Sequence, residues 1–267
     1  MKIKEFLKEV NGSYILEKVL NKDRAWLFLN DTFEVPSKAI EILEKIKSGY
    51  PIEYIFEEVY FYGDRFYIKE GVLIPRDDTE VVVERGIELI RRLGAKKVVD
   101  CCTGSGVIAI EVAKQTGARV LATDISDVAI KVCSKNIMLN NVEEKVKVIK
   151  SNLLKPQNLK EVREFGFEVE GNIIKGDILI SNPPYVENSW AKPNEYEPDI
   201  AFFGGEDGLD IVRELIKEAK KAEYKGAVIE IGYNQQEKLS KFLEDKVKSF
   251  EFFKDLAENI RGVEIIF

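Results

Sequence analysis

The chain contains no histidine and only three cysteines among 267 residues. The missing histidine excludes serine–histidine and cysteine–histidine catalysis, histidine metal sites and a histidine general base. The cysteines are Cys101, Cys102 and Cys133, and because two of them are adjacent they fit neither a disulfide framework nor the spacing of a zinc site. We therefore expect no metal, and any chemistry must use carboxylates, amides, backbone groups or a cofactor.

Long apolar runs and an excess of positive charge are missing as well. No apolar run approaches the roughly 18 residues that a membrane-spanning helix needs. The first residues, MKIKEFLKEV, carry charges where a signal peptide has its apolar stretch, so we expect a cytoplasmic protein without membrane contact. The net charge is −7, and neither residues 1–70 nor residues 71–267 have an excess of lysine and arginine. A nucleic-acid partner is therefore not expected.

The apolar pattern changes twice along the chain. Residues 1–57 contain short segments with apolar residues at helical spacing, which predicts a small helical bundle. Residues 58–74 are rich in aromatic and β-branched residues around a Gly-Asp pair, which predicts a β-hairpin linker. Residues 75–267 begin with a helix after Thr79 and alternate strand and helix from Lys97, which predicts a parallel sheet with helices on both faces. The last two strand segments lie too close together for a helical crossover, so they should form a hairpin that makes the last strand antiparallel.

A glycine-rich loop is expected directly after the first strand of this alternation, where the sequence reads DCCTGSG from Asp100 to Gly106. Glycines let the backbone approach a ligand closely, and the start of the following helix offers free N–H groups. Asp124 ends the next predicted strand, where a carboxylate can accept hydrogen bonds from two ribose hydroxyls. These features predict a nucleotide-type site, although the spacing is not that of the dinucleotide-binding fingerprint. The alternatives are an ordinary tight turn and a helix N-cap at Asp124.

The segment Asn182-Pro183-Pro184-Tyr185 follows another predicted strand, DILI. Two prolines fix two φ angles and lack N–H donors, so Asn182 and the Pro183 carbonyl can be held rigidly as acceptors. Two acceptors that hold the hydrogens of a conjugated –NH2 group can align its lone pair, which raises its reactivity by positioning, without a base. The alternative is a proline turn after a strand.

Together, the glycine loop, Asp124 and the NPPY segment resemble S-adenosylmethionine-dependent class I methyltransferases that act on amide or amino nitrogen. Nearly the whole chain resembles one group of them, the PrmC/HemK family of release factor glutamine methyltransferases. The further segments that carry this resemblance are IPRDDTE, NEYEP, GGEDGLD, VIEIGYNQ and DLAENIRGV. The resemblance implies an α/β fold with a Rossmann-like, seven-stranded, mostly parallel sheet, in residues 75–267. It also implies that residues 1–57 are a helical substrate-docking domain and that the hairpin of residues 58–74 links the two.

The activity that the resemblance implies is methyl transfer from S-adenosylmethionine, with S-adenosylhomocysteine as product. The acceptor would be the side-chain amide nitrogen, N5, of the glutamine in the Gly-Gly-Gln motif of class-1 peptide chain release factors. The implied catalytic residues are Asn182, Pro183 and Tyr185. The implied cofactor-binding residues are Cys102, Thr103, Gly104, Ser105, Gly106, Asp124, Asn152, Leu153 and Asn182. The implied substrate-binding residues are Asn182, Pro183, Pro184, Tyr185, Arg76, Thr79 and Glu80.

Three features depart from the family pattern. Cys102 stands where the family has the first glycine of its loop, Asp77 replaces a proline, and the helical domain is shorter than usual. For two of the implied residues an alternative stays open. Asp77 and Glu80 could form a capping box for the helix that begins near Thr79. Asn152 could accept a hydrogen bond from the adenine amino group or be an ordinary loop residue.

Other functions remain as alternatives at this point. A glutamine methyltransferase of a ribosomal protein shares the NPPY segment but usually lacks the PRxxTE loop. A DNA adenine N6-methyltransferase must flip its base and grip a duplex, which the acidic balance disfavours. A non-catalytic cofactor-binding module is a third alternative, which cofactor turnover would exclude. We expect a monomer.

Overall fold

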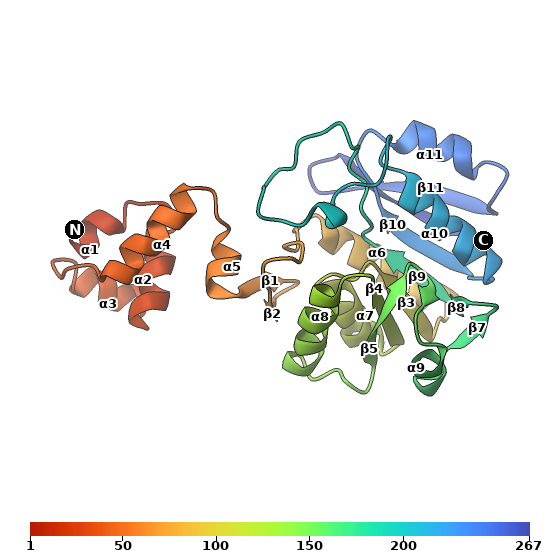
Figure 1. Ribbon diagram of the computed structural model, residues 1–267, viewed down its shortest axis with the longest axis horizontal. Helices are drawn as coiled ribbons and strands as arrows, with labels where there is room; N and C mark the ends of the chain where they lie inside the picture. The colour runs from red at the N-terminus through yellow and green to blue at the C-terminus, as the bar shows by residue number, and fades with distance from the viewer. The chain divides into compact units, whose positions relative to one another are not determined.

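Apolar residues at helical spacing in the first part of the chain fold into short helices around a core of their own, which includes Phe6 and Leu43. The helices are α1 (Ile3–Phe6), α2 (Gly12–Leu20), α3 (Arg24–Leu29), α4 (Ser37–Lys47) and α5 (Ile52–Phe56). Pro36 is the N-cap of α4. The computed structural model describes every residue from 1 to 267 and divides into two units, Met1–Phe56 and Glu57–Phe267 (Figure 1).

A central sheet organises the second unit. Its strand order is β11-β12-β10-β9-β3-β4-β5-β6. The strands are β3 (Lys97–Cys101), β4 (Arg119–Asp124), β5 (Val146–Asn152), β6 (Lys155–Pro156), β9 (Ile178–Ser181), β10 (Gly226–Glu230), β11 (Ser249–Lys254) and β12 (Ile260–Ile266). The pairs from β10 to β5 are parallel, and β12 is antiparallel to both β10 and β11, as the closing hairpin predicts. The predicted count of seven strands is one too low, because the two-residue β6 folds back on the end of β5.

Helices cover both faces of this sheet (Figure 1). The helices are α6 (Thr79–Leu93), α7 (Val107–Thr116) and α8 (Asp127–Leu139) on one face, and α9 (Leu159–Glu164), α10 (Asp210–Lys221) and α11 (Gln236–Leu243) on the other. Successive side chains of a strand point to opposite faces, so Val98, Ile178 and Ile180 pack with the first set. Val99 and Leu179 pack with the second set. None of the helices has the length and apolar character needed to span a membrane.

The strand order reverses between β3 and β9. From β3 the chain proceeds outward to β4 and β5, and it then returns to place β9 and β10 on the other side of β3. Cys101 and Ser181, the last residues of β3 and β9, are paired, and the Ser181 hydroxyl donates to the Cys101 carbonyl at 2.6 Å. Ligands of open α/β sheets bind at such a reversal, at the carboxyl ends of the strands. The glycine-rich loop and the NPPY segment both start there.

The predicted hairpin forms, but it is shorter than expected. Its strands are β1 (Glu58–Phe61) and β2 (Asp64–Tyr67), and residues 68–78 are an irregular loop instead of its continuation to residue 74. The physical reason is a competing partner, since the Ile74 N–H donates to the Glu197 carboxylate at 2.9 Å and not to a neighbouring strand. Phe61 and Phe66 pack in the same core as α6 and α7, so the hairpin is part of the second unit.

A buried asparagine joins this hairpin to the glycine-rich loop. The Asn136 side chain, on α8, accepts from the Tyr67 N–H at 2.6 Å and donates to the Tyr67 carbonyl at 2.8 Å. It also donates to the Ser105 carbonyl at 2.8 Å. Three of the four hydrogen bonds that an amide can make are thus satisfied, which is what a fully buried polar group requires.

One carboxyl group is buried beneath the hairpin without a hydrogen-bond donor. The Glu111 side chain, on α7, is fully buried, and neither of its oxygens has a hydrogen-bond partner. The Lys114 ammonium lies 3.7 Å away, and it is also paired with Asp64 of β2. Burial raises the pKa of Glu111 to about 7, although Lys114 acts in the opposite direction.

Two elements between β6 and β9 are not predicted from the sequence. One is the short helix α9, and the other is a hairpin of β7 (Glu168–Glu170) and β8 (Ile173–Lys175). The hairpin turns at Gly171, which has a left-handed φ of 63°. Both elements cover the second face of the sheet and take no part in the cavities described below.

Candidate active site

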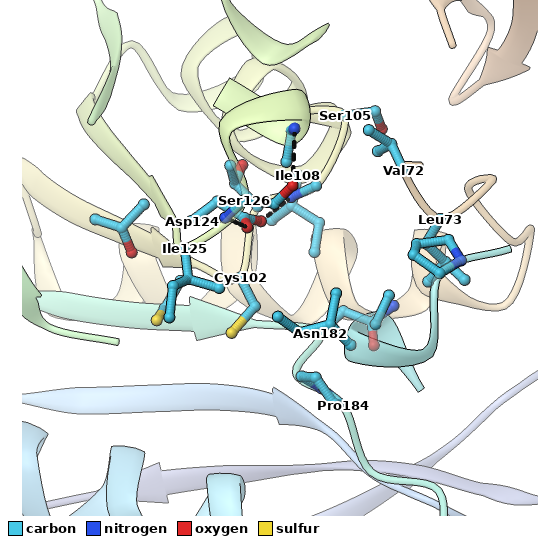
Figure 2. A pocket seen from close by; sticks show the side chains of 18 of the residues that line it. Val72, Leu73, Cys102, Ser105, Ile108, Asp124, Ile125, Ser126, Asn182 and Pro184 are labelled. Atoms are coloured by element: carbon cyan, nitrogen blue, oxygen red, sulfur yellow. Dashed lines mark hydrogen bonds between the residues drawn. The ribbon is translucent and has the colours of Figure 1, made fainter. Parts of the chain in front are cut away.

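Two cavities open at the reversal of strand order, and they share part of their lining, which includes Asn182. The first has a volume of about 330 Å³ and lies over the ends of β3 and β4 (Figure 2). The second has a volume of about 470 Å³ and lies beside Tyr185 and Glu230. Leu73, Asn182 and Ala201 line both of them. Chemistry between a ligand in one cavity and a ligand in the other would therefore take place beside these three residues, and Asn182 is the one among them with a polar side chain.

The glycine-rich loop has a left-handed backbone at every second residue. The φ angles of Cys102, Gly104 and Gly106 are 59°, 55° and 88°. Glycine adopts such angles without steric cost, which explains the spacing of the two glycines. The Thr103 hydroxyl donates to the buried Asp100 carboxylate at 2.5 Å, which fixes the loop from below. Burial raises the pKa of Asp100 to about 7, despite this hydrogen bond and one from the Ala109 N–H.

Gly106 has a packing role in this structure. It is the N-cap of α7, and a Cβ there would lie 2.5 Å from the Cys133 sulfur. The other residues of the loop that are predicted to bind a cofactor, Cys102, Thr103, Gly104 and Ser105, all line the first cavity, and Gly106 does not. The glycine at 106 thus allows the close packing of α7 on α8 that holds the loop.

Asp124 lies in the wall of the first cavity, where its carboxylate faces the glycine-rich loop (Figure 2). One oxygen accepts from the Gly104 N–H and the other from the Ser126 N–H, both at 2.9 Å. Each oxygen keeps a lone pair for a further donor. Burial raises the pKa of Asp124 above its ordinary value. The alternative of an N-cap at Asp124 is wrong, because Ser126 is the N-cap of α8 and accepts from the Ala129 N–H.

Three further segments contribute to the first cavity. Asn152, the last residue of β5, and Leu153 line it, together with apolar side chains of residues 71–75 and the short 3-10 helix η1 (Asp199–Ala201). The lining is therefore largely apolar, with Asp124 as its carboxylate. This combination suits a ligand that has a flat apolar ring system and neighbouring hydroxyl groups.

The NPPY segment is held by contacts from distant parts of the chain. The Asn182 Nδ2 donates to the Thr79 hydroxyl oxygen at 3.2 Å. The Thr79 and Tyr185 hydroxyls both donate to the Glu230 carboxylate, at 2.8 and 2.9 Å. Pro183 is buried and lines neither cavity, whereas Pro184 lines the first. A plain proline turn would not need this network of buried polar contacts.

Tyr185 belongs to the second cavity. Its ring lines that cavity and is absent from the lining of the first. Its carbonyl accepts from the Gln235 side chain at 2.7 Å, and its hydroxyl is fixed by Glu230. Burial, and then Glu230, raise the pKa of the Tyr185 hydroxyl, so it remains a hydrogen-bond donor at all ordinary pH values. Tyr185 therefore lies outside the wall of the first cavity.

Arg76 and Glu80, both predicted to bind substrate, are occupied by the chain itself. The Arg76 guanidinium lines the second cavity and donates to Glu197 at 2.6 Å and to the Ile74 carbonyl at 2.8 Å. Glu80 lines neither cavity, and its carboxylate accepts from the Tyr62 N–H at 2.6 Å. The alternative of a capping box is wrong, because the N-cap of α6 is Asp78 and no side chain caps it.

Cys102, which replaces the first glycine of the family's loop, has a strained backbone and a side chain in the wall of the first cavity. Its φ of 59° is one that side chains avoid, at a cost of about 1–2 kcal/mol. Its side chain lines the first cavity and also packs against the core beneath it. A hydrogen bond to Cys101 and burial raise the pKa of the thiol, so it stays neutral.

We expect Cys102→Gly to retain or raise cofactor affinity, because glycine relieves the left-handed strain and removes a side chain from the cavity wall. Stability should change by less than about 1 kcal/mol, since the relieved strain offsets the greater flexibility of glycine. Calorimetric titration and thermal unfolding measure the two effects. Cys102→Ala is the matched control, because it removes the sulfur and keeps the backbone strain. A Cys102→Gly variant with much weaker binding and unchanged stability would contradict this account.

Comparison with known proteins identifies the family. A family model described as "Ribosomal protein L11 methyltransferase (PrmA)" matches residues 83–181. The chain is 37% identical to the release factor glutamine methyltransferase of Clostridium acetobutylicum, covering 96% of this chain and 93% of that protein. It is 34% identical to the release factor glutamine methyltransferase of Dictyoglomus turgidum, with 99% and 94% covered. The chain belongs to the release factor glutamine methyltransferase family.

A solved structure confirms the fold class. The ribosomal protein L11 methylase of Lactobacillus delbrueckii subsp. bulgaricus is 24% identical, with a TM-score of 0.50 over 76% of this chain and 86% of that chain. The fold is the Rossmann-like α/β fold of class I methyltransferases, with a large and mostly parallel central sheet.

Three charged residues near the second cavity of this release factor glutamine methyltransferase were not predicted as site residues. They are Glu197, Glu230 and Arg261, and all three line or support the second cavity. Each lies in a segment that carries the family resemblance, namely NEYEP, VIEIGYNQ and DLAENIRGV. The signal available in the sequence was a carboxylate at the end of the apolar strand VIEIG. In the structure this residue, Glu230, is only 1% exposed. Ionisable residues whose pKa is strongly shifted by burial and by a charged partner are frequent at functional sites.

Proposed function

We propose that this chain methylates the side-chain amide nitrogen, N5, of the glutamine in the Gly-Gly-Gln motif of class-1 peptide chain release factors, with S-adenosylmethionine as methyl donor. The observation that carries the proposal is the position of Asn182 in the lining that the two cavities share. Family membership supports the substrate class. Release factors act at ribosomes, which places the proposed reaction in the cytoplasm, with a protein and not a nucleic acid as partner, and with the enzyme as a monomer.

The first cavity fits the cofactor. The Asp124 carboxylate keeps lone pairs for ribose hydroxyls, and Asn152 and Leu153 lie where an adenine ring can pack. The left-handed loop at Gly104 lets the backbone approach the ligand without side-chain obstruction. When bound there, S-adenosylmethionine supplies an electrophilic methyl group on a positively charged sulfur.

The chain's own contribution is to orient the acceptor amide. The Asn182 NH2 group is held by Thr79, so its Oδ1 is free to accept a hydrogen bond from the target amide. The Pro183 carbonyl is the proposed second acceptor, although Pro183 lines neither cavity, and Tyr185, which lines the second cavity, is the residue proposed to pack on the amide plane. An amide nitrogen is a poor nucleophile, so fixing its lone-pair direction is the available means of acceleration. The methylated nitrogen loses its proton to water, and no histidine is needed.

Labelled methyl transfer tests this function. The chain is incubated with labelled S-adenosylmethionine and a class-1 release factor, and the matched control is the same factor with the motif glutamine replaced by alanine. We expect label on the first and none on the second. Ribosomal proteins and duplex DNA form the other arms of the experiment. Label on either of these, or no turnover with any acceptor, would overturn the proposal.

A ribosomal-protein acceptor is the alternative that the family model raises. That model matches residues 83–181 and so ends one residue before Asn182. The matched region holds the glycine-rich loop and Asp124, which serve the cofactor, and it excludes Arg76, Thr79 and the NPPY segment. The match therefore covers the proposed cofactor-binding residues, which both kinds of methyltransferase need. The proposed acceptor-binding segments lie outside it, so the match does not favour a ribosomal protein over a release factor as acceptor.

We further propose that the helical unit, residues 1–56, docks the release factor. It exposes large apolar side chains around α3, with Phe28 67% and Leu29 86% exposed. Apolar groups of this size are costly to leave in water and are typical of a protein-binding surface. The first cavity is lined only by residues of the second unit.

Deletion of residues 1–56 is expected to leave cofactor affinity unchanged and to raise KM for the release factor by roughly tenfold or more, which corresponds to about 1.4 kcal/mol of lost docking energy. Steady-state kinetics and calorimetric titration measure these effects. Phe28→Ala combined with Leu29→Ala in the full chain provides a control that keeps the unit and should raise KM in the same direction. If the folded, truncated enzyme methylates the intact factor as well as the full chain does, the unit has no docking role.

A further inference from the structure

A buried carboxylate is linked to the proposed catalytic amide of Asn182 through one intervening side chain, that of Thr79. Glu230 ends β10 and is 1% exposed. One of its oxygens accepts from the Thr79 hydroxyl at 2.8 Å and the other accepts from the Tyr185 hydroxyl at 2.9 Å. The Thr79 oxygen in turn accepts from the Asn182 Nδ2 at 3.2 Å. A continuous chain of hydrogen bonds therefore joins Glu230 to Asn182 and Tyr185.

The direction of these hydrogen bonds determines how the Asn182 amide is oriented. A hydroxyl has one proton, and Thr79 gives its proton to Glu230. Only lone pairs of the Thr79 oxygen then face Asn182, so Asn182 must present its NH2 group to Thr79. The Oδ1 of Asn182 is thereby turned away from Thr79, which leaves it for a ligand in the cavities that Asn182 lines. With the opposite orientation, Asn182 would meet an incoming amide with donors instead of an acceptor.

Other charges around Glu230 are themselves fixed. Arg261 is the cation that faces it, and this guanidinium is held by Asp255 and Asp78, each at 2.7 Å. Burial raises the pKa of Glu230 to about 7, while Thr79, Tyr185 and Arg261 lower it and Asp78 raises it. The carboxylate thus changes its protonation state near neutral pH.

We propose that Glu230 is a positioning residue, whose ionised carboxylate fixes the Asn182 amide through Thr79 and holds the Tyr185 hydroxyl beside the acceptor. The inference rests on the proposed amide methylation and adds a residue and a protonation requirement to it. When Glu230 gains a proton, one of its oxygens becomes a donor. When the protonated oxygen donates to Thr79, the Thr79 hydroxyl can rotate and point its hydrogen at Asn182. The Asn182 amide can then rotate by half a turn and exchange the positions of its NH2 group and its oxygen. The rate of methyl transfer therefore falls as pH drops through the pKa of Glu230.

Glu230→Gln should imitate the protonated state, because glutamine offers one acceptor and one donor group. We expect the single-turnover rate at pH 8 to fall roughly 10- to 100-fold, as is typical when a hydrogen bond to a charged group is lost. Cofactor affinity should stay unchanged, and the limb of the pH–rate profile near pH 7 should disappear. Glu264→Gln replaces a buried carboxylate on the neighbouring strand β12, so it is the matched control and should keep both rate and profile.

Thr79 variants test the route. Thr79→Val removes the relay hydroxyl and should resemble Glu230→Gln in rate and in its flat pH profile, whereas Thr79→Ser keeps the hydroxyl and should restore both. The Thr79→Val/Glu230→Gln variant should be no slower than Glu230→Gln alone, because Thr79 acts on Asn182 only through its hydrogen bond to Glu230. Multiplying losses, or a pH limb that survives in Glu230→Gln, would overturn the inference.

A readout without substrate separates this inference from the proposed function. The side-chain amide resonances of Asn182, assigned by their loss in Asn182→Asp, should shift with pH in the wild type and stay constant in Glu230→Gln. Constant resonances in the wild type would overturn the inference even if the release factor is methylated. A wild type that titrates as expected but labels no release factor would instead overturn the proposed function and leave the positioning role intact.

Discussion

Asn182→Ala is expected to slow single-turnover methyl transfer to a release factor by about 10²–10³-fold, equivalent to about 2.7–4 kcal/mol of barrier. The variant removes the oriented Oδ1, so the target amide can rotate and its lone pair is no longer aligned. Cofactor affinity should change far less, because Asn182 is one of many residues that line the first cavity. Rapid-quench measurement of transfer and separate calorimetric titration of the cofactor distinguish the two effects.

Asn182→Asp is the sharper companion of this variant. It keeps an acceptor oxygen but loses the NH2 group that donates to Thr79 and adds a charge near the Glu230 carboxylate. The structure therefore predicts slow transfer with cofactor binding retained. Asn188→Ala, at an exposed asparagine of the following loop, is the control and should transfer at the wild-type rate. Near wild-type transfer by Asn182→Ala would reduce the NPPY segment to a structural turn.

Asp124→Ala should weaken cofactor binding by about 1.5–3 kcal/mol, through loss of charge-assisted hydrogen bonds to the ribose. The structure adds a second cause, because Asp124 also holds the Gly104 N–H and so helps to shape the glycine-rich loop. The dissociation constant measured by calorimetry should rise roughly 10- to 150-fold.

A nearby carboxylate provides the control for this prediction. Asp127 is 70% exposed, pairs with Lys150 at 2.7 Å and does not line the first cavity. Asp127→Ala removes the same charge from the same region, so it should leave the affinity unchanged. If Asp124→Ala binds the cofactor with wild-type affinity, the ribose is not held by this residue.

Local sequence patterns were sufficient for the elements that position the site. The apolar strands and the turn residues at Gly104 and Gly106 depend on neighbours in sequence, so the strand–loop–helix unit of the first cavity could be predicted. The hairpin of β7 and β8 was missed although its sequence, EVEGNIIK, alternates around a glycine turn. Its strands have only three residues each, which is too short for periodicity to indicate a strand with certainty.

Roles that depend on long-range contacts could not be read from the sequence. Glu230 and Thr79 are 151 residues apart, and Arg76 and Glu197 are 121 apart, yet each pair is joined by a hydrogen bond. Nothing local indicates which carboxylate will meet which donor. Glu80 shows the converse, since its motif suggests a site residue while its carboxylate binds the Tyr62 N–H outside both cavities.

The buried carboxyl of Glu111 couples folding to the uptake of a proton. Its pKa is about 7 in the folded chain, compared with an ordinary value of 4.5. Between these values the folded state binds more protons than the unfolded state, so this group favours the fold fully below pH 4.5 and loses that contribution as pH rises through about 7. Because the chain has no histidine, no imidazole titrates in this range to oppose it. This group thus stabilises the folded chain most strongly on the acidic side of neutrality.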